Sequence, residues 1–193
     1  MSVYLKLLPE LYTGVKSGSK YLAQKTRSVF TSVKPETLRY KTPTQLQDEI
    51  RAAYREYSRS AYINDYLREG KVLSQRDKQQ VWALKAAINT SEPITGTFIR
   101  GLSPKRNMPI NPDTIEKFIF KNAGFTSTAP LENANFANSF ASMGGATVKF
   151  EITKPMQAYK ASNYEVLFNT NAFTPDKFKI IHEGDNVYRV VQK

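Results

Sequence analysis

The chain has 193 residues, enough for one domain, or for one domain with an appended segment, and long enough to bury a substantial core. Hydrophobic residues make up 40% and aromatic residues 12%, which is ordinary for a globular protein, and no run of about 18 apolar residues could span a membrane. The chain has no cysteine and a single histidine, His182. Disulfides, zinc chemistry and cysteine or Ser-His nucleophilic catalysis are therefore excluded.

The formal charge of +11 favours an anionic partner, such as a nucleic acid, an acidic protein or a membrane surface. Residues 1–42 carry eight lysines and arginines against Glu10 and Glu36 only. With their glycines, serines and threonines, they predict a basic, weakly structured arm. Three interpretations stay open: a solubilising or capping segment, a contact arm for an acidic partner, or a short amphipathic element around Val3 to Tyr12.

The first apolar stretch of the chain does not predict a secretory leader. It is cut short by Pro9 and Glu10, and no small-residue cleavage site follows it. We therefore expect no signal peptide.

Residues 43–92 carry apolar side chains at helical spacing. Thr44 with Gln47, and later Ser74 with Asp77, are typical of helix N-termini, and Gly70 is typical of the position after a helix. We expect three helices, over residues 43–57, 60–68 and 74 to a point before Pro93.

The rest of the chain predicts mainly short strands, rich in β-branched and aromatic residues and bounded by Gly, Pro, Asn or Asp. The expected strands cover residues 97–100, 124–127, 147–152, 157–160, 165–168, 178–182 and 187–191, and two helices cover 114–121 and 131–142. Helices followed by strands indicate the α+β class. No internal repeat is present.

Three of these strands carry an arginine, a serine and a glutamate in that order. Each alone has an ordinary explanation as a surface cation, a turn residue or a solvated carboxylate. Their neighbours are more specific, and the runs are Phe98-Ile99-Arg100-Gly101, Gly124-Phe125-Thr126-Ser127-Thr128 and Tyr164-Glu165-Val166-Leu167-Phe168. These motifs resemble those of the mono-ADP-ribosyltransferases, in particular the bacterial toxins. The resemblance implies cleavage of NAD at its nicotinamide bond.

A second segment, residues 57–68, resembles one found in the clostridial Rho-modifying exoenzymes and the actin-modifying binary toxins. In those families the matching asparagine and arginine touch NAD, which implies the same for Asn64 and Arg68. The two residues are four apart, so on a helix they share a face and could hold one phosphate together. The ordinary explanation is a solvated helix face, but the three later motifs favour the NAD contact.

The resemblance covers residues 43–193 as a catalytic domain and leaves the arm of residues 1–42 unexplained. It implies N-terminal helices followed by two packed, mainly antiparallel small sheets. It also implies NAD as co-substrate, with no metal. The predicted catalytic residues are Glu165, Ser127 and Arg100, and the predicted NAD-binding residues are Asn64, Arg68, Arg100, Gly101, Thr128 and Phe140.

Each role has a chemical reason. The carboxylate of Glu165 would stabilise the positive charge that develops on the ribose, and Ser127 would hold Glu165 in place. Arg100 and Arg68 would bind the two phosphates, and Gly101 would let the backbone approach the nicotinamide amide. Phe136 or Phe140 could stack on nicotinamide, although core packing is the expected duty of each.

The acceptor is expected to involve Asn163 and Tyr159. Arginine-modifying members of the family carry a glutamate at the position of Asn163, so we expect the modified group not to be arginine. The loop from Gln157 to Tyr164 is shorter than in many members, and Ala129 stands where many have a second serine. The sequence leaves a protein side chain and an RNA or DNA base open as acceptors.

We therefore expect a toxin or effector that transfers ADP-ribose from NAD to a macromolecule in the cytoplasm of its own or a host cell. A neutralising antitoxin or immunity protein is a possible partner. The alternative is a degenerate member that binds NAD or nucleic acid without transfer. A plain RNA-binding module has little support, because no aromatic RNA-binding signature is present.

Overall fold

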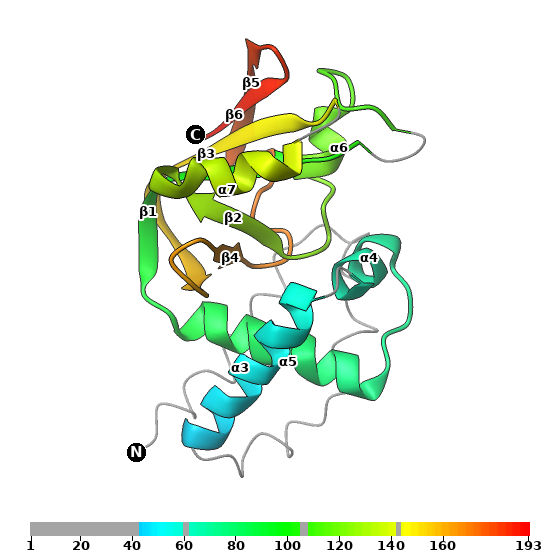
Figure 1. The fold of residues 1–193 in the computed structure, drawn as a ribbon, viewed down its shortest axis with the longest axis vertical. Coiled ribbons are helices and arrows are strands. Elements are labelled where there is room, and N and C mark those ends of the chain that lie inside the picture. The colour runs from blue at the N-terminus through cyan, green and yellow to red at the C-terminus, as the bar shows by residue number, and fades with distance from the viewer. Residues whose placement is uncertain (1–42, 60–61, 105–107, 142–143) are drawn as a thin grey trace. The chain divides into compact units, whose positions relative to one another are not determined.

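A computed structural model of the chain describes residues 43–59, 62–104, 108–141 and 144–193 (Figure 1). The predicted arm over residues 1–42 lies outside the described residues. The chain forms two compact units, the first ending at Ala83 and the second comprising Leu84–Lys193.

The first unit is helical, as predicted. It contains α3 (Pro43–Arg59), α4 (Tyr62–Glu69) and the start of α5 (Gln75–Thr90), which continues into the second unit. Helix α4 is followed by Gly70, whose φ of 65° lets the amide of Lys71 donate to the carbonyl of Tyr66 at 2.9 Å. Helix α5 begins where the hydroxyl of Ser74 accepts the amide of Asp77 at 3.2 Å, as its capping pattern predicts.

Helix α4 is tied to both of its neighbours in the first unit. The amide nitrogen of Asn64 donates to the hydroxyl of Tyr57 on α3 at 2.9 Å. On the other side the hydroxyl of Tyr62 donates to Asp77 Oδ1 on α5 at 2.5 Å. That hydrogen bond to a carboxylate is the main cause that raises the pKa of Tyr62 to about 12. These bonds fix the face of α4 from which Asn64 projects.

In its described residues the second unit contains six strands and four short helical segments, in addition to the end of α5. The strands are β1 (Pro93–Leu102), β2 (Thr126–Pro130), β3 (Ala146–Lys160), β4 (Val166–Phe168), β5 (Phe178–Gly184) and β6 (Val187–Gln192). Helix α6 (Ile115–Ile119) precedes β2, and the segment between β2 and β3 holds η2 (Leu131–Asn133), α7 (Ala134–Asn138) and η3 (Ser139–Ala141). The predicted α+β class, with helices first and strands after them, is confirmed.

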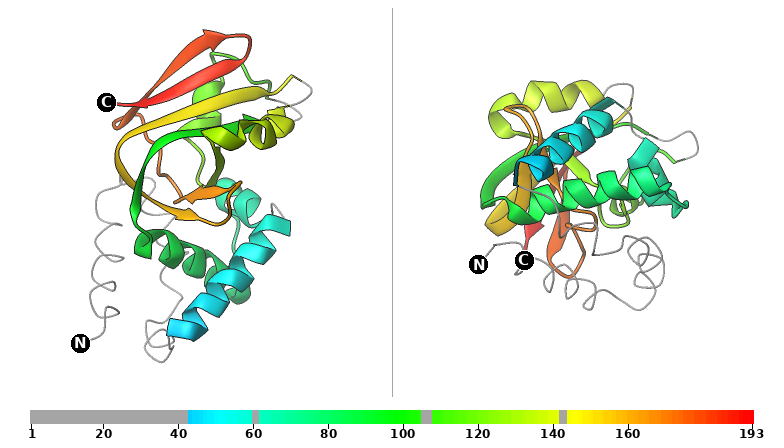
Figure 2. Two further views of the ribbon diagram at one scale, coloured as in Figure 1. Left: turned by 60° about the vertical axis from the view of Figure 1, so that its left-hand side comes forward. Right: turned by 90° about the horizontal axis from the view of Figure 1, so that it is seen from below.

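Four of the strands form a closed circuit of pairing. Strand β1 pairs with both β2 and β3, and β4 pairs with β2 on one side and β3 on the other. Strand β6 adds to β3 and β5 adds to β6, giving the order β1-β2-β4-β3-β6-β5. All of these pairings are antiparallel except β3 with β6. The long curved strands β1 and β3 run beside each other in Figure 2 and join the two predicted sheets.

Strand β3 is one continuous strand where the sequence predicts two. The predicted break falls at Pro155, which has no amide hydrogen for a ladder bond. In the structure the pairing of β3 with β1 shifts register at this point, between Ile94 and Gly96. The bulge on β3 accommodates Pro155, so the strand continues through it.

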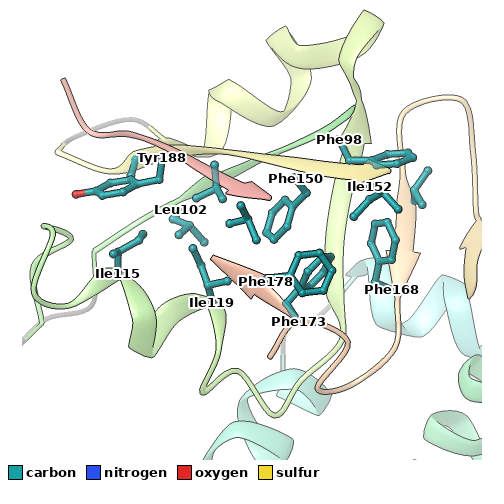
Figure 3. Packing of buried hydrophobic residues seen from close by; sticks show 14 of the residues in the cluster. Phe98, Leu102, Ile115, Ile119, Phe150, Ile152, Phe168, Phe173, Phe178 and Tyr188 are labelled. Carbon is teal, nitrogen blue, oxygen red and sulfur yellow. The ribbon is translucent and has the colours of Figure 1, made fainter. Parts of the chain in front are cut away.

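The main core of the second unit lies on one face of the strands. Figure 3 shows Phe150, Phe173 and Phe178 packed together, with Tyr188 toward the other end of the cluster. The rings of Phe150 and Phe173 are 4.4 Å apart. A smaller cluster of Ile99, Ala129 and Ala137 lies where α7 packs on β1 and β2. Helix α7 therefore covers the face of β1 opposite the main core.

The helix predicted over residues 131–142 is broken into η2, α7 and η3, and its last residue lies outside the described residues. Asparagine and serine side chains interrupt it by bonding to the backbone or to neighbouring strands. The hydroxyl of Ser139 donates to the carbonyl of Phe136 at 2.7 Å, and Asn138 accepts from Thr147 on β3 at 3.1 Å.

Candidate active site

Ser127 and Glu165 are brought together by the pairing of β2 with β4. Ser127 lies on β2 opposite Leu167, and Glu165 stands immediately before β4. The hydroxyl of Ser127 donates to Glu165 Oε1 at 2.5 Å, across 38 residues of sequence. Strand alternation places Tyr159 of β3, which is also opposite Leu167, on the same face as this pair. The predicted carboxylate, its serine and one predicted acceptor residue thus share one face.

The backbone of Glu165 is held by the turn that precedes it. Its carbonyl accepts the amides of Ala161 at 3.0 Å and of Ser162 at 3.2 Å. Asn163, predicted to recognise the acceptor, lies exposed in this turn, and its carbonyl accepts the side-chain amide of Asn133 at 2.8 Å. The turn is therefore anchored both within itself and to η2.

Thr128 lies on the other face of β2. It is buried, and its hydroxyl donates to the carbonyl of Val166 at 3.1 Å. This bond joins β2 to β4 on the side of the main core. The structure shows Thr128 bonded to the neighbouring strand, and the NAD contact predicted for it stays a prediction.

Arg100 lies on β1 between Phe98 and Leu102, which both belong to the main core. It is paired with Val148 of the same core, so strand alternation directs its Cβ toward that side. Ile99, its neighbour, is paired with Ala129, which lies on the face of Ser127. The Cβ atoms of Arg100 and Ser127 therefore lie on opposite faces of the β1–β2 pair. The guanidinium of Arg100 could reach a ligand beside Ser127 only through the length of its side chain.

Gly101 has a packing reason to be glycine. A Cβ built on it would collide with the carbonyl oxygen of Ala137 and would lie 2.7 Å from the amide nitrogen of Ala141. Gly145 is similar, since its Cβ would collide with the carbonyl of Leu102 and lie 2.7 Å from that of Ala141. These two glycines let the α7–η3 segment lie directly on the strands. The approach to nicotinamide predicted for Gly101 stays a prediction.

Phe136 and Phe140 do not pack in the core, so that part of the sequence interpretation is wrong. The two side chains are 49% and 55% exposed, and their rings meet edge to face at 5.5 Å. They lie on α7 and η3, where short helical segments over the strands turn them outward. Phe140 is thus available to a ligand, as an NAD-binding residue must be.

Asn64 and Arg68 belong to the first unit. Asn64 is only 6% exposed, and its amide nitrogen is engaged by Tyr57. Arg68 pairs with Asp65 at 3.2 Å on the same helix. The phosphate contact predicted for these two residues stays a prediction.

Within the described residues, no group of three or more His, Asp or Glu side chains could hold a metal ion. The helices described there also include none that is long and apolar enough to cross a membrane.

Sequence reasoning missed Asn133 and Tyr164. Asn133 lies 30 residues from the turn it binds, so no local pattern could reveal that contact. Tyr164 is 56% exposed and its ring lies 5.9 Å from that of Phe136. Its position beside Glu165, in a turn of small polar residues, is the sequence feature that could have indicated an exposed ring at the site.

The chain has the fold of the ADP-ribosyltransferases. Its structure matches Exoenzyme S of Pseudomonas aeruginosa, solved in complex with human 14-3-3 protein beta and bound to carba-NAD, with a TM-score of 0.53, 18% identity and coverage of 90% of this chain and 88% of that one. It matches the C3 exoenzyme of Clostridium limosum with a TM-score of 0.52 and 18% identity, over 77% and 87% of the two chains. It matches Vis toxin, an ADP-ribosyltransferase from Vibrio splendidus, with a TM-score of 0.51 and 18% identity, over 91% and 85%. No protein-family model and no curated protein matches the sequence.

Proposed function

We propose that this protein is a mono-ADP-ribosyltransferase that uses NAD as co-substrate and modifies a macromolecule. The observation that carries the proposal is the 2.5 Å hydrogen bond from Ser127 to Glu165, formed at adjacent strands of an ADP-ribosyltransferase fold. A carboxylate held in one orientation by a strand hydroxyl can stabilise a positive charge that develops beside it. Cleavage of the nicotinamide bond of NAD develops such a charge on the ribose.

The residues of the second unit suit NAD. Glu165 accepts hydrogen bonds and can hold a ribose hydroxyl, and the half-exposed ring of Phe140 offers a face for a planar nicotinamide. Arg100 supplies a guanidinium for a phosphate, reached from the neighbouring strand. Similarity to a structure that contains carba-NAD and to a protein called a toxin supports NAD use and a toxin or effector role.

The test is the rate of NAD cleavage in two site variants and one control. Glu165→Gln keeps the size of the side chain but removes its charge, so kcat should fall by about two to three orders of magnitude. Ser127→Ala should cost about tenfold, because the carboxylate remains but loses its support. Glu116→Gln makes the same change at an exposed glutamate of α6 and should leave the rate unchanged.

Both site variants should remain folded, with Ser127→Ala losing at most the roughly 1.5–3 kcal/mol of its hydrogen bond to the Glu165 carboxylate. A kcat for Glu165→Gln within about threefold of the parent would overturn the assignment. Absence of NAD cleavage by the parent protein would favour a degenerate member of the fold that binds without transfer.

A further inference from the structure

Exposed apolar side chains gather beside Glu165. Among the described residues, five large hydrophobic side chains are exposed, and four of them are Leu131, Phe136, Phe140 and Tyr164. Leu131 begins η2, the two phenylalanines lie on α7 and η3, and Tyr164 directly precedes Glu165. The three half-exposed rings of Phe140, Phe136 and Tyr164, which neighbour one another in that order, present on the order of 300 Å² of apolar surface, the size at which patches on soluble proteins are often functional.

The support beneath these rings is fixed. The hydroxyl of Ser103 donates to the carbonyl of Phe140 at 2.7 Å, which ties η3 to the end of β1. Gly101 and Gly145 allow the same segment to lie against the strands, and Asn138 is bonded to Thr147. Rings that a rigid segment holds in water lose little further freedom when they bind a ligand, which favours a binding surface.

Two of the rings link this support to the turn of Glu165. The rings of Phe136 and Tyr164 lie 5.9 Å apart with an interplanar angle of 48°, and Tyr164 is the next residue to the carboxylate. The bond from Asn133 to the carbonyl of Asn163 joins the same two segments. A planar group resting on Tyr164 would thus lie next to the site of NAD cleavage.

The surroundings of Tyr164 indicate the chemistry of that group. The exposed amide of Asn163 can donate and accept, as the edge of a nucleobase requires. The whole chain carries a formal charge of +11. Exposed rings and an amide on a basic protein are components of a single-strand stacking platform.

We propose, resting on the proposed transferase function, that Tyr164 and Phe136 form a stacking platform for an unpaired base of a single-stranded RNA acceptor. Because Tyr164 and Phe136 face solvent, they can stack only on a base that is not already stacked between its neighbours in the nucleic acid. RNA offers such bases in loops and ends without the cost of opening a duplex.

The transfer that this platform would serve balances as a substitution at the ribose of NAD. The bond from the ribose carbon to the nicotinamide nitrogen breaks, and nicotinamide leaves with the electron pair. A nitrogen of the stacked base forms a new bond to the same carbon and loses one proton to solvent. The products are ADP-ribosylated RNA, nicotinamide and a proton.

The experiment uses the full chain, labelled NAD and a mixed-sequence RNA of about 12 nucleotides, a length within the usual range of single-strand sites. Label in RNA is counted after protease and after nuclease treatment, and NAD hydrolysis is measured without RNA. Tyr164→Ala should lower the ratio of transfer to hydrolysis by about tenfold or more, the effect of losing one base stack. Tyr164→Phe keeps the ring and should stay within about threefold of the parent ratio. Val72→Ala, which removes an exposed apolar side chain 87% accessible in the first unit, should leave the ratio unchanged.

Each outcome decides one point. Label that resists nuclease but is lost with protease would show a protein acceptor and overturn the proposal. Equal labelling of single-stranded DNA of the same sequence would overturn the assignment to RNA. An unchanged ratio in Tyr164→Ala, in a variant whose melting temperature matches the parent, would overturn the platform. NAD cleavage without RNA labelling would refute this inference alone, whereas no NAD cleavage at all would refute the transferase function.

Discussion

Glu165 is fixed at both its side chain and its backbone. Ser127 holds one carboxylate oxygen, and the amides of Ala161 and Ser162 hold the carbonyl. A hydrogen bond to a charged group stabilises by roughly 1.5–3 kcal/mol, so the Ser127 contact is strong enough to select one rotamer. The turn itself depends on a residue outside it, Asn133, which binds the carbonyl of Asn163.

Asn133→Ala should therefore reduce turnover without unfolding the protein. Removing this tether frees the turn that carries Glu165, and we expect kcat for NAD cleavage to fall about threefold to tenfold while KM changes little. Steady-state kinetics and a melting curve would measure this. Asn135→Ala is the matched control, because Asn135 is an exposed asparagine of the adjoining helix α7. An equal fall in both variants, or a fall in KM alone, would contradict a positioning role for Asn133.

At the scale of elements, the α7–η3 segment determines how the site is built. It packs on β1 through Ile99 and Ala137, and it presents Phe136 and Phe140 outward. The segment can lie this close to the strands only because Gly101 has no Cβ. Backbone atoms of Ala137 and Ala141 occupy the place where that Cβ would stand. The glycine after Arg100 is thus needed for packing, whatever contact it makes with NAD.

Gly101→Ala should displace this segment. We expect a loss of about 1–3 kcal/mol in the free energy of unfolding, typical of an overpacked site, together with a fall in NAD cleavage. Denaturant titration and the cleavage assay would measure the two effects. Gly144→Ala is a useful comparison, since its Cβ would meet nothing within 4 Å although its φ is +78°. It should lower stability through backbone strain but leave cleavage intact. Normal cleavage by Gly101→Ala would show that the position of the segment does not matter.

The sequence predicted elements well where the signal is local. Gly70 marked the end of α4 and Ser74 marked the start of α5, because caps are defined by neighbouring residues. It failed at Pro155, where a bulge that depends on β1 lets β3 continue. It also failed for the rings of Phe136 and Phe140, whose exposure depends on how α7 lies on the strands.

The candidate site was predictable in part for the same reason. The Arg, Ser and Glu motifs predicted which strands carry the site. The register between those strands, however, decides which side chains lie on the same face. Register joins Ser127 to Glu165 and turns Thr128 toward the core. It also directs the Cβ of Arg100 to the face opposite Ser127, which no single strand could reveal.

At the scale of the whole molecule, charge is unevenly distributed along the chain. Residues 1–42 hold eight lysines and arginines and two glutamates, which is +6 of the formal +11. Residues 84–193 hold thirteen basic and nine acidic residues, a net +4. The unit that contains Ser127 and Glu165 is thus only moderately basic, and much of the attraction for a polyanion would come from the rest of the chain.

Transfer to RNA should consequently depend on salt more strongly than NAD hydrolysis does. Binding that neutralises about two to four phosphates of a single strand predicts an affinity loss of about 7-fold to 50-fold between roughly 50 and 200 mM salt. NAD is small and carries two phosphates, so its hydrolysis should change far less over the same range. Initial rates of both reactions, measured at subsaturating RNA across a salt series, provide the comparison. Parallel salt curves would show that the basic charge of the chain does not recruit the acceptor, and would favour an uncharged surface as the source of acceptor affinity.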